Sequence, residues 1–191
     1  MKFWFDTEFL EDGRTIELIS IGVVAEDGRE YYAETKGAEG LATSTEWLSE
    51  NVFPHLSSPL RKDAKDEKTI AADLIEFMGD KPEIWAYYAD YDWVVLCQLH
   101  GRMVDLPKGW PMYCRDVKQL CDMFGNPELP KRTSTEHHAL ADARWTRDAW
   151  LWLKANAGKI SIWSQTSVNT SIDDPAPTVD EMRSRMIGRS P

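Results

Sequence analysis

Cysteine is scarce in this sequence, and the few residues present are poorly placed for cross-linking. The 191 residues include three Cys, at positions 97, 114 and 121, which is an odd number without a C-x-x-C pair. This spacing argues against a disulfide or zinc framework. We therefore interpret the three side chains as reduced thiols and predict a cytoplasmic protein.

Long apolar segments are also missing. The sequence has no run of about 18 apolar residues, so no membrane-spanning helix and no membrane partner are predicted. The opening residues 1–6 turn acidic too soon for a signal peptide.

Basic residues are outnumbered by acidic ones. The 22 Lys and Arg against 32 Asp and Glu leave a formal net charge of −10, which argues against a broad basic surface for nucleic acid. An enzyme that grips a few phosphates remains compatible, since divalent ions would cancel part of the charge. Basic residues concentrate at Arg61-Lys62, at Lys131-Arg132, and at Arg144 with Arg147, where solvated surface charge is the plain alternative.

The pattern of apolar residues predicts an α/β fold. Apolar runs predict strands at 2–5, 16–25, 30–34 and 83–88, and Asp27-Gly28 is typical of a hairpin turn. Helical spacing predicts helices at 66–78, 91–100, 116–124 and 137–155, and the capping box at 43–46 predicts another. In the helix at 91–100 we expect Val94, Val95 and Leu99 to point inward. We expect one domain over residues 1–157 and a polar extension over 158–191, with a short helix begun by Thr178 and Glu181.

Five polar residues lie at the ends of these strands or in these helices. They are Asp6 and Glu8 after the first strand, Asp92 after the fourth strand, and His137 and Asp142 in the last helix. Asp6 and Glu8 alternate along an extended chain and therefore point to the same side. Asp142 lies in an apolar helix, where a carboxylate is costly unless it is paired or bound to metal. The plain alternatives are a chance D-x-E, a helix-capping Asp92 and an exposed His137.

Four carboxylates and one imidazole suit two-metal hydrolysis of a phosphodiester. Carboxylate oxygens favour Mg²⁺ or Mn²⁺, and two such ions can hold the attacking and leaving oxygens of an in-line displacement. A histidine whose pKa is near neutrality can take the proton from the attacking water. Without metal, we expect the carboxylates to repel one another. The sequence has no P-loop, G-x-S-x-G elbow or thiol–imidazole motif that would indicate another mechanism.

The motifs Asp6-Thr7-Glu8, a mid-chain Asp92 and the H-x-A-x-x-D-A pattern of residues 137–143 resemble the DEDDh exonuclease superfamily. Residues 5–9, 15–24 and 96–99 are more closely similar to the small bacterial 3′–5′ exoribonucleases called RNase AS. The resemblance covers about residues 1–155 and implies a ribonuclease H-like fold. It also implies that Asp6 bridges two ions, Glu8 and Asp142 complete one, and Asp92 holds the other through water.

The same resemblance implies His137 as the general base, a homodimer, and a preference for adenylate-rich single-stranded RNA attacked at its 3′ end. Phe9 and Leu10 lie where relatives contact the terminal nucleotide. Tyr88 and Tyr91 are candidates for base stacking or for core packing.

Some alternatives stay open at this point. His138 stands four residues before Asp142, where the DEDDy branch has its tyrosine, so either histidine can be argued as the base. Residues 87–92 lack the His-Asn pair common in wider DEDDh enzymes. The alternative functions are a DNA 3′–5′ exonuclease and a non-catalytic binding module.

Overall fold

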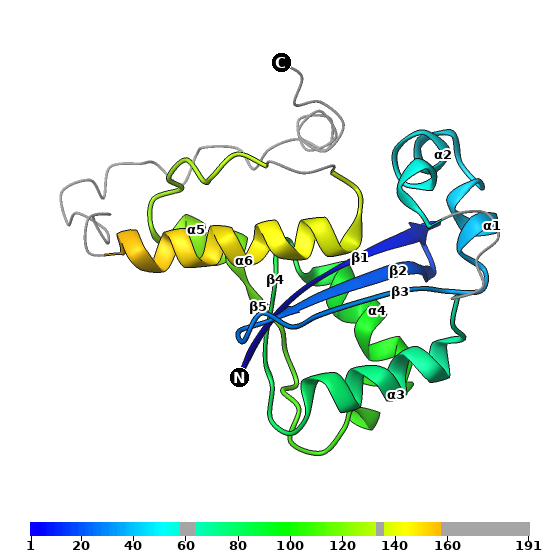
Figure 1. Ribbon diagram of the computed structural model, residues 1–191, viewed down its shortest axis with the longest axis horizontal. Coiled ribbons are helices and arrows are strands. Elements are labelled where there is room, and N and C mark those ends of the chain that lie inside the picture. Colours follow the sequence, from blue (N-terminus) through cyan, green and yellow to red (C-terminus); the bar gives the residue numbers. More distant parts are fainter. Residues whose placement is uncertain (58–63, 133–135, 158–191) are drawn as a thin grey trace.

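The computed structural model describes residues 1–57, 64–132 and 136–157, which form one mixed sheet with helices on both faces (Figure 1). The strands are β1 (Lys2–Glu11), β2 (Ile16–Ala25), β3 (Glu30–Glu34), β4 (Glu83–Ala86) and β5 (Arg115–Asp116). The helices are α1 (Ala38–Ala42), α2 (Glu46–Asn51), α3 (Glu67–Met78), α4 (Asp90–His100), α5 (Val117–Met123) and α6 (Ala139–Asn156). Short 3₁₀ turns, η1 (Phe53–His55) and η2 (Met103–Asp105), follow α2 and α4.

The sheet has the order β3-β2-β1-β4-β5. β1, β2 and β3 are antiparallel neighbours, whereas β4 runs parallel to β1 and β5 runs parallel to β4. The predicted hairpin turn between β2 and β3 is confirmed: Gly28 has a φ of 90° and its N–H donates to the carbonyl of Ala25 at 3.0 Å. A positive φ suits glycine because it has no Cβ.

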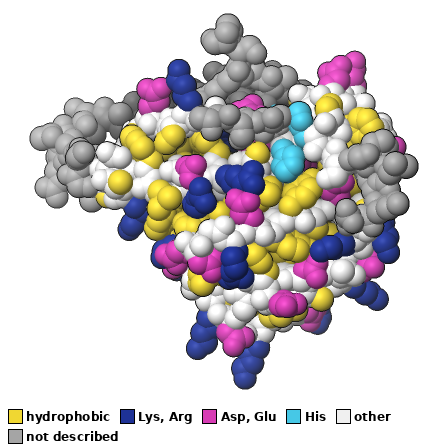
Figure 2. All heavy atoms as spheres, viewed as in Figure 1, with side chains coloured by type: hydrophobic (Ala, Val, Ile, Leu, Met, Phe, Trp, Pro, Cys, Tyr) yellow, Lys and Arg dark blue, Asp and Glu magenta, His cyan; other side chains and the backbone are white. Residues whose placement is uncertain are grey.

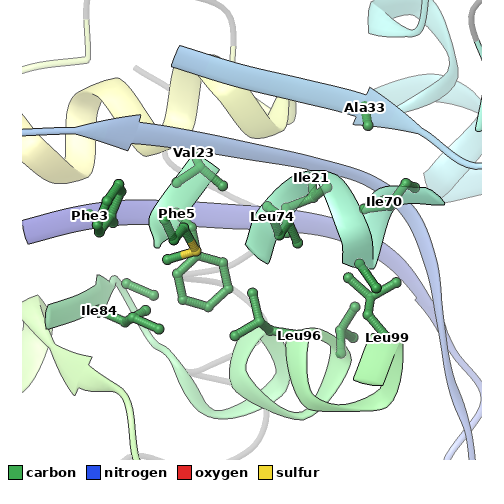
Figure 3. Packing of buried hydrophobic residues seen from close by; sticks show 14 of the residues in the cluster. Phe3, Phe5, Ile21, Val23, Ala33, Ile70, Leu74, Ile84, Leu96 and Leu99 are labelled. Carbon is green, nitrogen blue, oxygen red and sulfur yellow. The ribbon is translucent and has the colours of Figure 1, made fainter. Parts of the chain in front are cut away.

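Two apolar layers hold the helices against the sheet. Side chains of β1, β2 and β4 pack against α3 and α4, and Figure 3 shows Phe5, Leu74 and Leu96 meeting in this layer. On the other face, Trp4 of β1 packs with α5 and α6. The sheet is therefore covered on both sides, as the predicted α/β class requires.

Several local predictions were wrong in detail. β1 continues to Glu11, well beyond the predicted end at Phe5, because it keeps pairing with β2 as far as Glu11 and Ile16. The capping box at 43–46 requires Thr43 as the helix cap. The observed cap of α2 is Thr45, whose side chain accepts a hydrogen bond from the N–H of Leu48, so the helix begins later, at Glu46. Val94, expected to point inward on α4, is 42% exposed.

Other outcomes concern the chain as a whole. No helix within the described ranges is long and apolar enough to cross a membrane. Cys97, Cys114 and Cys121 are free thiols, as predicted. Arg61-Lys62 and the predicted helix at Thr178 lie outside the described residues, and the division of the chain after residue 157 stays a prediction.

Candidate active site

The prediction that Asp6 and Glu8 follow the first strand is wrong, because both residues lie inside β1. The pairing of β1 explains their position. Its parallel contact with β4 stops at Trp4, whereas its antiparallel contact with β2 continues to the end of the strand. The two carboxylates therefore follow the parallel part of β1, and as alternate residues they lie on the same face, the one that carries Trp4 and α6.

The third carboxylate reaches this face because α6 approaches the sheet very closely. Gly22 of β2 pairs with Asp6, and a Cβ atom built on it would lie 2.3 Å from both Cα and N of Leu140. The first turn of α6 thus rests directly on the backbone of β2. This approach brings Asp142 to Asp6 and Glu8, and the three residues offer ligand oxygens within 4.8 Å of one another.

Asp92 joins this cluster from the other side of β1. Its buried Oδ1 accepts hydrogen bonds from the backbone N–H of Thr7 at 2.8 Å and from the Thr7 hydroxyl at 2.5 Å. Thr7 lies beyond the residues that pair with β4, so Asp92 takes the place of a strand partner. The helix-cap alternative for Asp92 is wrong, because Ala89 occupies the cap position of α4.

Burial and mutual repulsion disfavour the charged forms of these carboxylates. Burial, and then the charges of Asp92 and Asp142, raise the pKa of Asp6 well above its usual value. Burial and the charge of Asp142 do the same for the pKa of Glu8. Burial raises the pKa of Asp92 to about 7. Divalent cations would relieve this repulsion, and buried carboxylate oxygens are the donors that Mg²⁺ and Mn²⁺ prefer. The residues present therefore fit a divalent metal centre.

A basic residue that the sequence left as a surface candidate enters the same site. Nη1 of Arg132 forms an ion pair with Oδ1 of Asp142. Burial raises the pKa of Asp142, and the guanidinium of Arg132 opposes that shift. The expected repulsion among the carboxylates is therefore partly offset within the protein itself.

The two adjacent histidines have different surroundings. His137 precedes α6 with a φ of 64°, and its backbone N–H donates to Oδ2 of Asp142 at 2.9 Å. Its ring lies edge-on to Trp47, with 4.9 Å between the centroids. Burial lowers the pKa of His137, which favours the neutral imidazole, although the charge of Asp142 opposes this.

His138 performs a structural task instead. It is the N-cap of α6, and its Nδ1 accepts a hydrogen bond from the N–H of Ala141 at 3.4 Å. Its ring also stacks on Tyr32 of β3, with 4.7 Å between the centroids. His138 thus fastens the start of α6 to the sheet.

The predicted substrate residues divide between surface and core. The rings of Phe9 and Tyr91 meet edge to face at 5.7 Å, and Tyr91 is 50% exposed. Tyr88 is 61% exposed, so core packing does not explain it. Leu10 packs against the apolar cluster formed by α1 and α2. The structure thus places Phe9 beside Tyr91 and gives Leu10 a packing role.

Four residues of this site were not assigned by the sequence. They are Thr7, which holds Asp92; Gly22, which admits α6; Trp47, which contacts His137; and Arg132. A glycine in the middle of an apolar strand is itself a signal of close backbone approach, so Gly22 could have been found. The contacts of Trp47 and Arg132 join residues far apart in the sequence or across a loop and carry no local signal.

Figure 2 shows histidine side chains at the surface on the face that α6 covers. Apolar, basic and acidic side chains surround them on this face.

Comparisons with known proteins agree with this arrangement. The model of the family described as "3'-5' exoribonuclease Rv2179c-like domain" matches residues 1–153. The 3′–5′ exoribonuclease Rv2179c of Mycobacterium tuberculosis strain H37Rv is 45% identical over 148 residues, covering 75% of this chain and 88% of that protein.

Solved structures show the same fold at low sequence identity. Pop2p of S. pombe, in a form with Mg²⁺ and Mn²⁺ bound, superposes with a TM-score of 0.55 at 13% identity and 86% coverage of both chains. Exonuclease I of E. coli, in a zinc-bound form with single-stranded DNA, gives 0.61 at 14% identity and covers 83% of this chain and 41% of that one. The predicted ribonuclease H-like exonuclease fold is confirmed. The chain belongs to the Rv2179c-like family of 3′–5′ exoribonuclease domains.

Proposed function

We propose that this protein is a two-metal 3′–5′ exoribonuclease that releases nucleoside 5′-monophosphates from the 3′ end of single-stranded RNA. The observation that carries the proposal is the convergence of Asp6, Glu8 and Asp142 within 4.8 Å, in a chain related at 45% identity to a named exoribonuclease. A non-catalytic module would have no need for three mutually repelling carboxylates at this distance.

Each acidic residue has an assigned task. Asp6 would bridge two divalent ions, Glu8 and Asp142 would complete the first, and Asp92 would serve the second. Both hydrogen bonds from Thr7 end on Oδ1 of Asp92 and hold this carboxylate at the cluster, where it would serve the second ion through water. When bound, the two ions supply the positive charge that stabilises the attacking and leaving oxygens in the transition state.

His137 would act as the general base. Its lowered pKa keeps the imidazole neutral near pH 7, so it can accept the proton of the attacking water. The hydrogen bond from its backbone to Asp142 fixes the base relative to a proposed metal ligand. The contact with Trp47 limits the orientations of the ring.

Around this centre, exposed Tyr88 and Tyr91 would stack on bases of the RNA, with Phe9 supporting Tyr91. Leu10 would contribute to the shape of the terminal nucleotide site. A preference for adenylate-rich RNA, a homodimer and a cytoplasmic location complete the proposal. They rest on the sequence resemblance and on the free thiols.

Digestion of end-labelled oligonucleotides tests the proposal. Matched RNA and DNA homopolymers labelled at the 5′ or the 3′ end should be incubated with the protein in Mg²⁺, in Mn²⁺ and in excess EDTA. We expect shortening of RNA from its 3′ end, with mononucleotide products, in either metal and none in EDTA. Preferential digestion of DNA would favour the alternative of a DNA exonuclease. Full activity in EDTA would contradict the metal mechanism.

A further inference from the structure

Arg132 is held at the carboxylate cluster by two ion pairs and one cation–π contact. Its Nη1 pairs with Asp142, its Nε lies 3.4 Å from Oε1 of Glu136, and its guanidinium carbon lies 4.4 Å from the centroid of the Trp145 ring. The side chain keeps 30% of its surface exposed, whereas that of Asp142 keeps 8%. Arg132 therefore reaches the buried carboxylate while part of its side chain remains in contact with solvent. We call this solvent-facing side of the cluster, next to Arg132, the opening of the site.

Trp145 provides a fixed support for this side chain. It lies three residues after Asp142 on α6, and its Nε1–H donates to the carbonyl of Pro130 at 2.9 Å. This bond ties the segment that carries Arg132 to the helix that carries Asp142. The guanidinium would thus stay near the opening even after its bond to Asp142 is broken.

A chain of ring contacts connects the same support to an exposed tyrosine. The rings of Trp145 and Tyr87 meet at 4.8 Å, and the rings of Tyr87 and Tyr88 meet at 4.9 Å. An aromatic row therefore runs from Trp145, under the guanidinium of Arg132, through Tyr87 to the exposed Tyr88. A cation for the backbone and an exposed aromatic ring for a base are the two elements that recognise a single-stranded nucleic acid, and here they lie at the two ends of one row.

Arg132 and a divalent ion require the same carboxylate. The guanidinium already occupies Oδ1 of Asp142, which is one of the three residues able to ligate an ion together. An ion that takes this oxygen must displace Nη1. The carboxylate of Glu136 already lies beside Nε of Arg132, whereas Nη1 would lose its partner. Beside bound cations this free end of the guanidinium gains most by contacting a further anion, and an exoribonuclease substrate supplies one as a phosphate.

We propose that Arg132 is a substrate-phosphate residue that is stored on Asp142 until a divalent ion takes that carboxylate. In the metal-free protein it neutralises part of the cluster. In the metal-loaded protein it contacts an RNA phosphate at the opening of the site. This inference rests on the proposed function.

Metal binding and RNA binding by Arg132→Gln test the two halves of the proposal. Calorimetric titration with Mn²⁺ in the absence of RNA should show the variant binding metal more tightly, by about fivefold or more, because the internal competitor is gone. In EDTA the variant should melt at a lower temperature than the parent, since the carboxylates lose their counter-charge.

RNA binding is then measured in a His137→Ala background with Mg²⁺, using an oligoadenylate and a series of KCl concentrations. Loss of one phosphate contact should reduce the slope of log affinity against log salt by about 0.7. Arg132→Lys keeps the charge and should restore the slope. Lys154→Gln is the matched control, since it removes one exposed charge from α6 about 18 Å along the helix from Asp142, and it should change neither quantity.

The outcomes separate the inference from the function on which it rests. A parent protein that binds neither Mn²⁺ nor RNA would overturn the proposed function and this inference together. A parent that binds both, with parental metal affinity and parental salt slope in Arg132→Gln, would overturn the role of Arg132 alone. Tighter metal binding with an unchanged slope would likewise reject the phosphate contact.

Discussion

Replacing Gly22 by alanine should push α6 away from the sheet and weaken the metal centre. The added Cβ would lie 2.3 Å from backbone atoms of Leu140 and 2.5 Å from the carbonyl carbon of Ala139. Ordinary contact begins at 3.4 Å, so the start of α6 must retreat by about 1 Å. The obstructing atoms belong to the backbone, which means that a side-chain rotation cannot relieve the clash.

The size of the effect follows from this displacement. Overpacking of this kind costs about 1–3 kcal/mol of unfolding free energy, which corresponds to a fall of roughly 3–10 °C in Tm for a domain of this size. The loss of catalytic rate should be larger than this loss of stability would suggest. Mg²⁺ demands near-ideal octahedral ligand geometry, and a 1 Å misplacement can cost about 100-fold in rate.

The assay compares Gly22→Ala with Gly40→Ala. Gly40 lies in α1 with nothing within 4 Å of the position of its Cβ, so that variant should melt at or above the wild-type temperature and keep full activity. Circular dichroism checks the fold, calorimetry measures Mn²⁺ affinity, and digestion of oligoadenylate measures kcat. A folded Gly22→Ala protein with wild-type metal affinity and kcat would refute the argument that Gly22 positions Asp142.

Three further predictions concern the histidines, the carboxylates and the exposed aromatics. His137→Ala should lower kcat at least 100-fold while Mn²⁺ binding is retained. His138→Ala should mainly lower Tm, because it removes a helix cap worth about 1 kcal/mol. If kinetics and melting show the reverse pattern, the roles of the two histidines are exchanged. Burial raises the pKa of Asp92 from 3.8 to about 7, so between these values the metal-free folded state binds more protons than the unfolded chain. The free energy of unfolding in EDTA should therefore fall as pH rises from about 4 to 7 and level off above that. Melting curves should show this decline reduced in Mg²⁺ and in Asp92→Asn, and a decline of equal size in all three samples would contradict it. Tyr88→Ala should raise the KM for RNA with kcat nearly unchanged, and Tyr88→Phe should restore it; an unchanged KM would exclude stacking on Tyr88.

The local sequence determined most of the secondary structure of this protein. The predicted bounds of β2 and β3 are those observed, because alternating and continuous apolar runs, together with Asp27-Gly28, encode strands and a tight turn through nearest neighbours alone. The same holds for α3, whose cap Asp66 and terminator Gly79 are both visible in the sequence. The choice of Asp6, Glu8, Asp92 and Asp142 as a set came from motif spacing, and the structure brings these residues together.

Only the tertiary structure decided how that set is arranged. The end of β1 depends on pairing with β2, and the exposure of Val94 depends on what packs against α4, so neither can be read from periodicity. The approach of α6 across Gly22 is a contact between segments more than 100 residues apart. The tertiary structure also decided that His138 caps α6 and that Arg132 pairs with Asp142. Their neighbours His137 and Lys131 have similar chemistry, and only the direction in which the folded backbone points each side chain distinguishes them.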